Sequence, residues 1–88
     1  MPELSRFYGM IIRMQYADNQ KHHKPHVHVL FAEHEAVVGI DGEVLAGSLP
    51  DNKYKLLQAW LIMRENELYA SWNKAVKNVP IEKIEPLK

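Results

Sequence analysis

Between Pro50 and Pro80 the chain contains neither glycine nor proline, the two residues that most often interrupt a helix. The apolar residues in this segment recur at spacings of three and four, which is the pattern of one helical face. They are Leu57, Trp60, Leu61, Leu68, Trp72, Ala75, Val76 and Val79, and Arg64 falls in the same stripe. The segment predicts a long amphipathic helix, so the fold must supply an apolar surface for that helix to cover.

One unbroken helix over the whole segment would be longer than any strand in the chain. At ~1.5 Å per residue it would span ~42 Å, whereas the longest predicted strand reaches only ~33 Å. We therefore expect a kink, or two helices, with the break at Glu65-Asn66-Glu67, where Asn66 can cap the second helix. At the start of the segment, Ser48 and Asp51 have the spacing of a capping box.

The residues before Pro50 follow a different period. From Arg6 to Tyr16 every second residue from Tyr8 onward is large and apolar or aromatic, which predicts a strand with one buried face. Further strands are predicted at His26–Phe31, Glu35–Ile40 and Glu43–Ala46. The predicted fold class is therefore α+β: an antiparallel meander of three to four strands packed on one long or kinked C-terminal helix, or on two helices.

Turn chemistry and facing side chains set the expected pairing of these strands. Asp41-Gly42 is the strongest hairpin signal, because a type I′ turn needs positive φ at both central residues. The first two predicted strands pair with consistent faces when the following residues are neighbours: Arg13 and His28, Gln15 and His26, Met14 and Val27, Ile12 and Val29. A slip of one residue would turn every side chain to the wrong face.

The tail after Pro80 is predicted to be non-helical. Ile81, Ile84 and Leu87 are spaced as apolar anchors that can hold it on the rest of the chain. With 88 residues and no linker-like segment, the chain is predicted to form a single domain, residues 1–88.

Composition narrows the classes of function. Lys and Arg together number 11, as do Asp and Glu, and the resulting zero net charge weighs against non-specific nucleic-acid binding. The chain has no cysteine, which excludes disulfides and zinc–thiolate sites. No apolar run approaches the ~18–20 residues of a membrane span. We expect a cytoplasmic protein without a membrane partner.

Four of the five histidines lie between His22 and His28, where a loop enters a predicted strand. His26 and His28 share one strand face, with Cα atoms ~7 Å apart. Both imidazoles can reach one metal ion if the loop supplies a third ligand, and His22 or His23 is placed to do so. The candidate metal site is His22, His26 and His28, with zinc as the candidate ion. The alternative without chemistry is a set of hydrogen-bonded or solvated histidines at the edge of a strand.

A metal-free reaction is the other chemical interpretation of this cluster. The candidate catalytic residues are His26 and His28 as general acid or base, and Arg13 as a bidentate phosphate ligand. Lys21 and Lys24 add positive charge to the loop, which favours single-stranded RNA as the substrate. Tyr8, Tyr16 and Phe7 are the candidate stacking groups.

Several stretches resemble one protein family in the same order along the chain. They are PELSRFYGMIIRM, KPHVHV, EAVVGIDGEVLAGSLP and ENELYASWNKAVKNVPIEKIEPL. Together they resemble the bacterial domain-of-unknown-function family 4160. That family typically has a histidine, a Pro-Pro step and then His-aromatic-His-Val, and His22, Pro25, His26, His28 and Val29 match those positions. Lys24 stands in place of the first proline and Val27 in place of the aromatic residue. The resemblance implies a link to toxin–antitoxin pairs, to which members are often suspected of belonging.

Two functions of different classes remain open. The first is a small protein-interaction module, one component of a toxin–antitoxin pair, that works as a homo-oligomer or with a protein partner. The second is a small histidine-dependent ribonuclease or metal-site enzyme that uses the histidine cluster. A homo-oligomer is expected because the helix would overhang the sheet, and because Phe7, Ile11 and Leu30 lie on the sheet's second face in the predicted strands.

Overall fold

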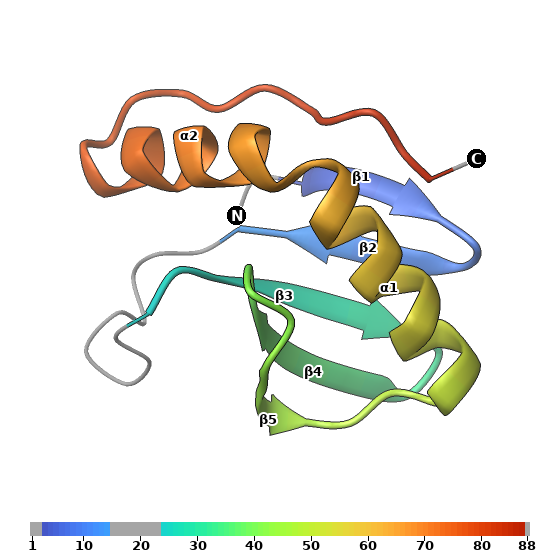
Figure 1. The fold of residues 1–88 in the computed structure, drawn as a ribbon. Helices are drawn as coiled ribbons and strands as arrows, with labels where there is room; N and C mark the ends of the chain where they lie inside the picture. The colour runs from blue at the N-terminus through green and yellow to red at the C-terminus, as the bar shows by residue number, and fades with distance from the viewer. Residues whose placement is uncertain (1–2, 15–23, 88) are drawn as a thin grey trace.

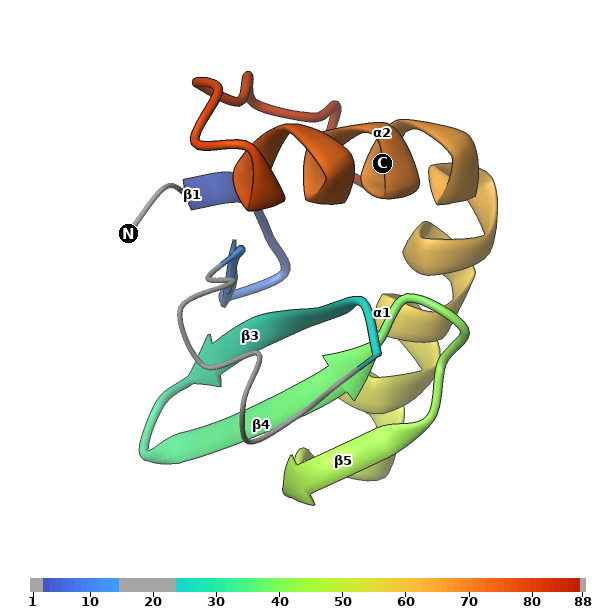
Figure 2. The same cartoon turned by 90° about the vertical axis from the view of Figure 1, so that its left-hand side faces the viewer.

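Five antiparallel strands in the order β1-β2-β3-β4-β5 form one sheet in the computed structural model, which describes residues 3–14 and 24–87 (Figure 1). The elements are β1 (Glu3–Phe7), β2 (Met10–Arg13), β3 (His26–Phe31), β4 (His34–Gly39), β5 (Val44–Gly47), α1 (Asp51–Met63) and α2 (Glu65–Val76). Figure 2 shows α1 along one side of the sheet and α2 across its top. The predicted α+β class and the antiparallel meander are confirmed, but the sheet has five strands and not three to four.

The extra strand comes from a turn at Tyr8-Gly9 that the alternating pattern concealed. Tyr8 has a φ of 51° and Gly9 a φ of 82°, and Phe7 pairs with Met10 across the turn. A two-residue turn of this kind reverses the chain and returns its flanking residues to the same face. Phe7 is therefore buried in the core at 6% exposure, while Tyr8 projects outward at 50%. The predicted single strand from Arg6 to Tyr16 is wrong, as are the faces assigned to Phe7 and Tyr8.

The register predicted between the strands that flank the histidine loop is confirmed. Ile12 pairs with Val29 and Arg13 pairs with His28. Val27, Val29 and Ile12 are fully buried, as expected for the core face. The predicted pairing of Gln15 with His26 lies outside the described residues. The next two strands are each displaced by one residue from the prediction, because β4 begins at His34 and β5 ends at Gly47.

The turn between β4 and β5 differs in type from the prediction. The N–H of Gly42 donates to the carbonyl of Gly39 at 2.8 Å, and the N–H of Gly39 donates to the carbonyl of Glu43 at 2.7 Å. Gly42 has the expected positive φ, at 98°, but Asp41 is not among the described residues with positive φ. The turn therefore spans 39–42 with glycine after its central pair, and the predicted type I′ turn centred on Asp41-Gly42 is wrong.

The predicted division of the helical segment is confirmed to within one residue. Arg64 separates α1 from α2 with a φ of −114° and a ψ of 19°, so the break lies just before the predicted Glu65-Asn66-Glu67. The predicted caps are wrong, because α1 begins after Pro50 without a side-chain cap and Asn66 lies inside α2. After the break, Leu68 and Trp72 of the apolar stripe are buried, whereas Val76 and Val79 at its end are 44% and 45% exposed.

The C-terminal tail runs beside β1 and holds the helices to the sheet (Figure 1). The N–H of Ile84 donates to the carbonyl of Leu4 at 2.7 Å, and the indole N–H of Trp60 donates to the carbonyl of Glu85 at 2.8 Å. Ile84 is buried in the core, and Ile81 and Leu87 pack against it. The predicted non-helical tail with three apolar anchors is confirmed. Leu4 on β1 is fully buried in the same core cluster as Ile84.

The two faces of the sheet have different surroundings. The core lies between the sheet and the helices, where Met10, Val29 and Val38 meet Leu57, Trp60 and Leu68. The other face, which we call the open face, carries residues outside the core cluster, of which Val37 is only 8% exposed: Arg6, Ile11, Arg13, His28, Leu30, Glu35 and Val37. In the part of the chain that the structure describes, no helix is long and apolar enough to cross a membrane.

Candidate functional site

Arg13 and His28 meet on the open face as cross-strand partners on β2 and β3. Residues directly opposite in an antiparallel pair have Cβ atoms only ~4.5–5.5 Å apart, so the two side chains are neighbours. The ring of His26 lies next to that of His28, with 5.4 Å between the ring centroids. The structure therefore brings together all three predicted catalytic residues at one end of β2 and β3.

His26 is held far more tightly than the sequence suggested. It is fully buried, and its ring lies 5.0 Å from the Trp72 ring of α2 between centroids. Its Nδ1–H donates to the carbonyl of Lys24 at 2.7 Å. Since a carbonyl can only accept, this bond places a ring proton on Nδ1. His26 is therefore hydrogen-bonded and not solvated, because α2 packs over this end of the strand.

The predicted metal ligands are divided between described and undescribed parts of the chain. His26 and His28 are adjacent, whereas His22 and His23 lie outside the described residues. Among residues 3–14 and 24–87, no group of three His, Asp or Glu side chains could hold a metal ion. His34 stacks on Phe31 with 6.2 Å between ring centroids, in the β3–β4 hairpin and away from the other histidines.

Arg13 is the candidate residue with an unmet hydrogen-bonding requirement. Its Nε is buried and has no acceptor among the described residues. Glu3 is its cross-strand partner on β1, and the carboxylate of Glu3 is engaged by Arg6 at 2.8 Å. This hydrogen bond from Arg6 is the main reason that the pKa of Glu3 is lowered. A buried guanidinium N–H without a partner favours an external acceptor such as a phosphate or carboxylate oxygen.

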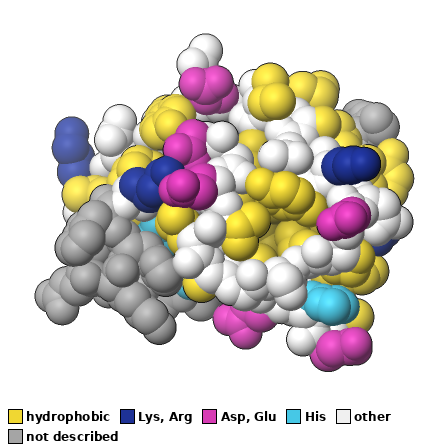
Figure 3. All heavy atoms as spheres, turned by 60° about the horizontal axis from the view of Figure 1, so that its bottom comes forward, with side chains coloured by type: hydrophobic (Ala, Val, Ile, Leu, Met, Phe, Trp, Pro, Cys, Tyr) yellow, Lys and Arg dark blue, Asp and Glu magenta, His cyan; other side chains and the backbone are white. Residues whose placement is uncertain are grey.

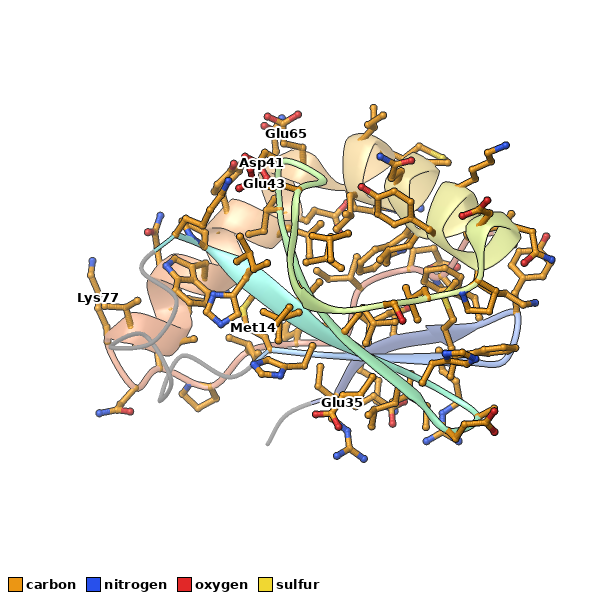
Figure 4. The ribbon with its side chains drawn as sticks, turned by 90° about the horizontal axis from the view of Figure 1, so that it is seen from below. Met14, Glu35, Asp41, Glu43, Glu65 and Lys77 are labelled. Atoms are coloured by element: carbon orange, nitrogen blue, oxygen red, sulfur yellow. The ribbon has the colours of Figure 1, made fainter. Side chains whose placement is uncertain are left out.

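The sequence missed the role of Lys24. Its ammonium group donates to the carboxylates of Asp41 and Glu43, each at 2.7 Å. Figure 4 shows that Asp41 and Glu43 lie next to each other. The hydrogen bond to Asp41 is the largest cause and the one to Glu43 the second, and together they raise the pKa of Lys24 to about 12. The same contact with Lys24, followed by the backbone N–H of Glu43, lowers the pKa of Asp41. Lys24 thus ties the start of β3 to the β4–β5 turn, and its charge is largely matched within the chain.

Three surface hollows formed by described residues lie away from the histidines. One of about 230 Å³ lies at the α1–α2 corner, where residues 62–67 line it. A second of about 270 Å³ lies between β1 and the tail, and a third of about 170 Å³ lies between α2 and the tail. Arg13, His26 and His28 line none of these three hollows.

Fold and site together define a small protein in which two helices pack on a five-stranded antiparallel sheet, with an Arg–His pair on neighbouring strands β2 and β3. The chain belongs to the family described as Domain of unknown function (DUF4160), which matches residues 9–73. The match covers both residues of the pair and ends within α2. No curated protein matches the chain, and no solved structure does. The resemblance noted in the sequence is confirmed.

Proposed function

We propose that this protein is a small protein-interaction module whose contact surface is the corner between α1 and α2. The observation that carries the proposal is the exposure of two consecutive apolar side chains, Ile62 at 75% and Met63 at 62%. Large apolar side chains that stand together at a surface are typical of protein interfaces. Methionine is well suited to this role, because its flexible thioether adapts to the shape of a partner.

The surroundings of these two residues support an interface. Ile62 and Met63 border the hollow at the corner, which can receive a side chain from a partner. Arg64 pairs with Glu67 at 3.2 Å, while its Nε is buried without an acceptor in the described part of the chain. Interface hot spots typically combine an apolar anchor, a pocket that receives a partner side chain and an arginine. The corner has all three features. The partner we propose is a protein that presents an apolar side chain next to a carboxylate or carbonyl acceptor.

The face that carries β5 adds further apolar surface. Figure 3 shows hydrophobic side chains gathered between charged ones on this side of the molecule, and Val44 on β5 is 42% exposed. The family resemblance implies a setting for the interaction, one component of a bacterial toxin–antitoxin pair. That setting belongs to the proposal and rests on the resemblance alone.

Replacing both corner residues, Ile62→Lys with Met63→Lys, is expected to weaken partner binding at least about tenfold, as for a hot-spot pair. The partner is first captured from the source cells with the parent chain, then purified and titrated against both chains by calorimetry. Because both side chains are largely exposed, the free energy of unfolding should change by no more than about 0.5 kcal/mol.

The matched control is Asn73→Lys, which adds a lysine at an exposed position of α2 away from the corner. This variant should bind the captured protein as the parent does. Equal affinities for the parent and the corner variant would refute the corner as the contact surface.

A ribonuclease is the second candidate, and the position of Arg13 opposite His28 favours it. The pair combines a phosphate ligand with a group able to transfer protons near neutral pH. His26 is fully buried and its Nδ1–H is bound to the carbonyl of Lys24, so Arg13 and His28 are the principal candidates of the three. Of the predicted stacking groups, Tyr8 is exposed, Phe7 is buried and Tyr16 lies outside the described residues.

If this candidate is correct, the parent chain cleaves single-stranded RNA, and Arg13→Ala and His28→Ala each lower the rate by about 10²-fold or more. The measurement is a gel assay near neutral pH, with and without a chelator, together with calorimetry of zinc binding. Cleavage that survives the chelator supports metal-free catalysis, and zinc binding that requires His22, His26 and His28 supports the metal site. His34→Ala is the control and should change neither signal. A parent chain that neither cleaves RNA nor binds zinc would eliminate both chemical interpretations.

A further inference from the structure

We infer that the open face of the sheet binds a second copy of this chain, related to the first by a two-fold axis parallel to the strands. This surface lies on the opposite side of the sheet from the helices, as Figure 2 shows. The inference goes beyond the proposed function, because it concerns a different surface and a different partner from those at the corner.

Four side chains in one row across the open face carry the argument. Arg6 on β1 pairs with Ile11 on β2, Ile11 pairs with Leu30 on β3, and Leu30 pairs with Glu35 on β4. The row therefore has a positive charge at one end, two apolar side chains in the middle and a negative charge at the other end. Figure 4 shows Glu35 on the side of the sheet away from the helices.

This order is self-complementary under one symmetry operation. A two-fold axis that lies between two facing sheets, parallel to the strands and over the gap between β2 and β3, reverses the strand order in the second copy. Arg6 then faces the second copy's Glu35, and Ile11 faces its Leu30. A closed, isologous interface of this kind is the commonest form of homo-oligomer. Moving the axis onto β3 would instead set Ile11 against Glu35, which buries a charge against an apolar side chain.

The state of each residue in the single chain fits this arrangement. Ile11 and Leu30 are half-buried and outside the core cluster, so a partner can bury them further. Glu35 is exposed, and the Arg6 side chain keeps 62% exposure despite its ion pair with Glu3.

Charge reversal can test the contact because Arg6 and Glu35 are too far apart to interact within one chain. They lie three strand spacings apart, ~14 Å, which exceeds the ~8 Å Debye length at physiological salt. Energetic coupling between the two positions must therefore arise between chains. Arg6→Glu places two acidic groups face to face in the proposed dimer, and Glu35→Arg places two basic groups face to face.

We expect sedimentation equilibrium at micromolar concentration to give twice the chain mass of 10.2 kDa. Each single reversal should raise the dimer dissociation constant about tenfold or more, and the double variant Arg6→Glu/Glu35→Arg should recover most of that loss. Lys55→Glu, a reversal at an exposed site on α1, should leave the dimer unchanged. Thermal unfolding confirms that each variant is folded.

A mass of one chain at every concentration would overturn the inference. A dimer that neither single reversal weakens, or single losses that simply add in the double variant, would overturn it equally. These outcomes are separate from the corner experiment. If the chain is a monomer but Ile62→Lys/Met63→Lys abolishes partner binding, the proposed function holds and the dimer does not. If the chain is a dimer but binds no partner, the dimer holds and the proposed function does not.

Discussion

Replacing Gly47 by alanine should destabilise the protein by about 3 kcal/mol or more, the largest effect expected for the removal of a single glycine here. Gly47 has a φ of 74°, and a Cβ at this position would lie 2.0 Å from the carbonyl oxygen of Glu35. That oxygen belongs to the backbone of β4, where Ala36 pairs with Gly47, so it cannot move aside as a flexible side chain can. Steric overlap therefore adds to the cost of an unfavourable backbone conformation.

The matched variant is Gly42→Ala in the β4–β5 turn. Gly42 also has positive φ, at 98°, but an added Cβ would meet only the amide nitrogen of Gln58, at 3.8 Å. Its loss should be about 1–2 kcal/mol, from the backbone conformation alone. Urea denaturation of the two variants measures the difference. Equal losses would contradict the close approach of β5 to β4 at Gly47.

Truncating Trp60 to alanine should cost about 3–5 kcal/mol. Trp60 is fully buried, and its ring lies 5.2 Å from the Phe7 ring between centroids. It also holds the tail through the hydrogen bond from its indole N–H to the carbonyl of Glu85. Small domains have a total stability of only about 5–15 kcal/mol, so this variant should show a large fall in the thermal midpoint and in urea resistance.

Trp60→Phe separates the two roles of the side chain. Phenylalanine retains most of the buried ring but cannot donate to Glu85, and we expect a loss of about 1 kcal/mol beyond the effect of its smaller volume. In a chain shortened to end at Val79, the acceptor is gone, so that part of the loss should disappear. A penalty for Trp60→Phe of the same size in the full and shortened chains would show that the tail does not depend on this bond.

Much of the framework follows from patterns within short stretches of sequence. Helical spacing after Pro50 predicted a helical segment, and its length predicted a break at Glu65-Asn66-Glu67, one residue after the observed break at Arg64. Alternation on both sides of the histidine loop predicted the pairing of Arg13 with His28, because only one register keeps the buried residues together. The anchors Ile81, Ile84 and Leu87 were predicted from their regular spacing of three residues, and all three lie in or against the core. These features depend on periodicity, which is a property of local sequence.

The sequence missed two kinds of feature. One is a turn that leaves the alternation of apolar and polar residues unchanged, and the other is contact between segments far apart in the chain. Tyr8 and Gly9 reverse the chain without disturbing the period-two pattern, so one strand became two and Phe7 entered the core. Lys24 meets carboxylates 17 and 19 residues away, and no local pattern links such positions.

The histidine cluster shows the same division. Local sequence was enough to place His26 and His28 at the start of one strand. Tertiary packing decided that His26 is buried against Trp72 with its Nδ1 proton bound to a carbonyl, while Arg13 keeps an Nε without an acceptor among the described residues. Burial and hydrogen-bond satisfaction are set by whatever segments surround a side chain in space, and two segments far apart in the chain meet only after folding.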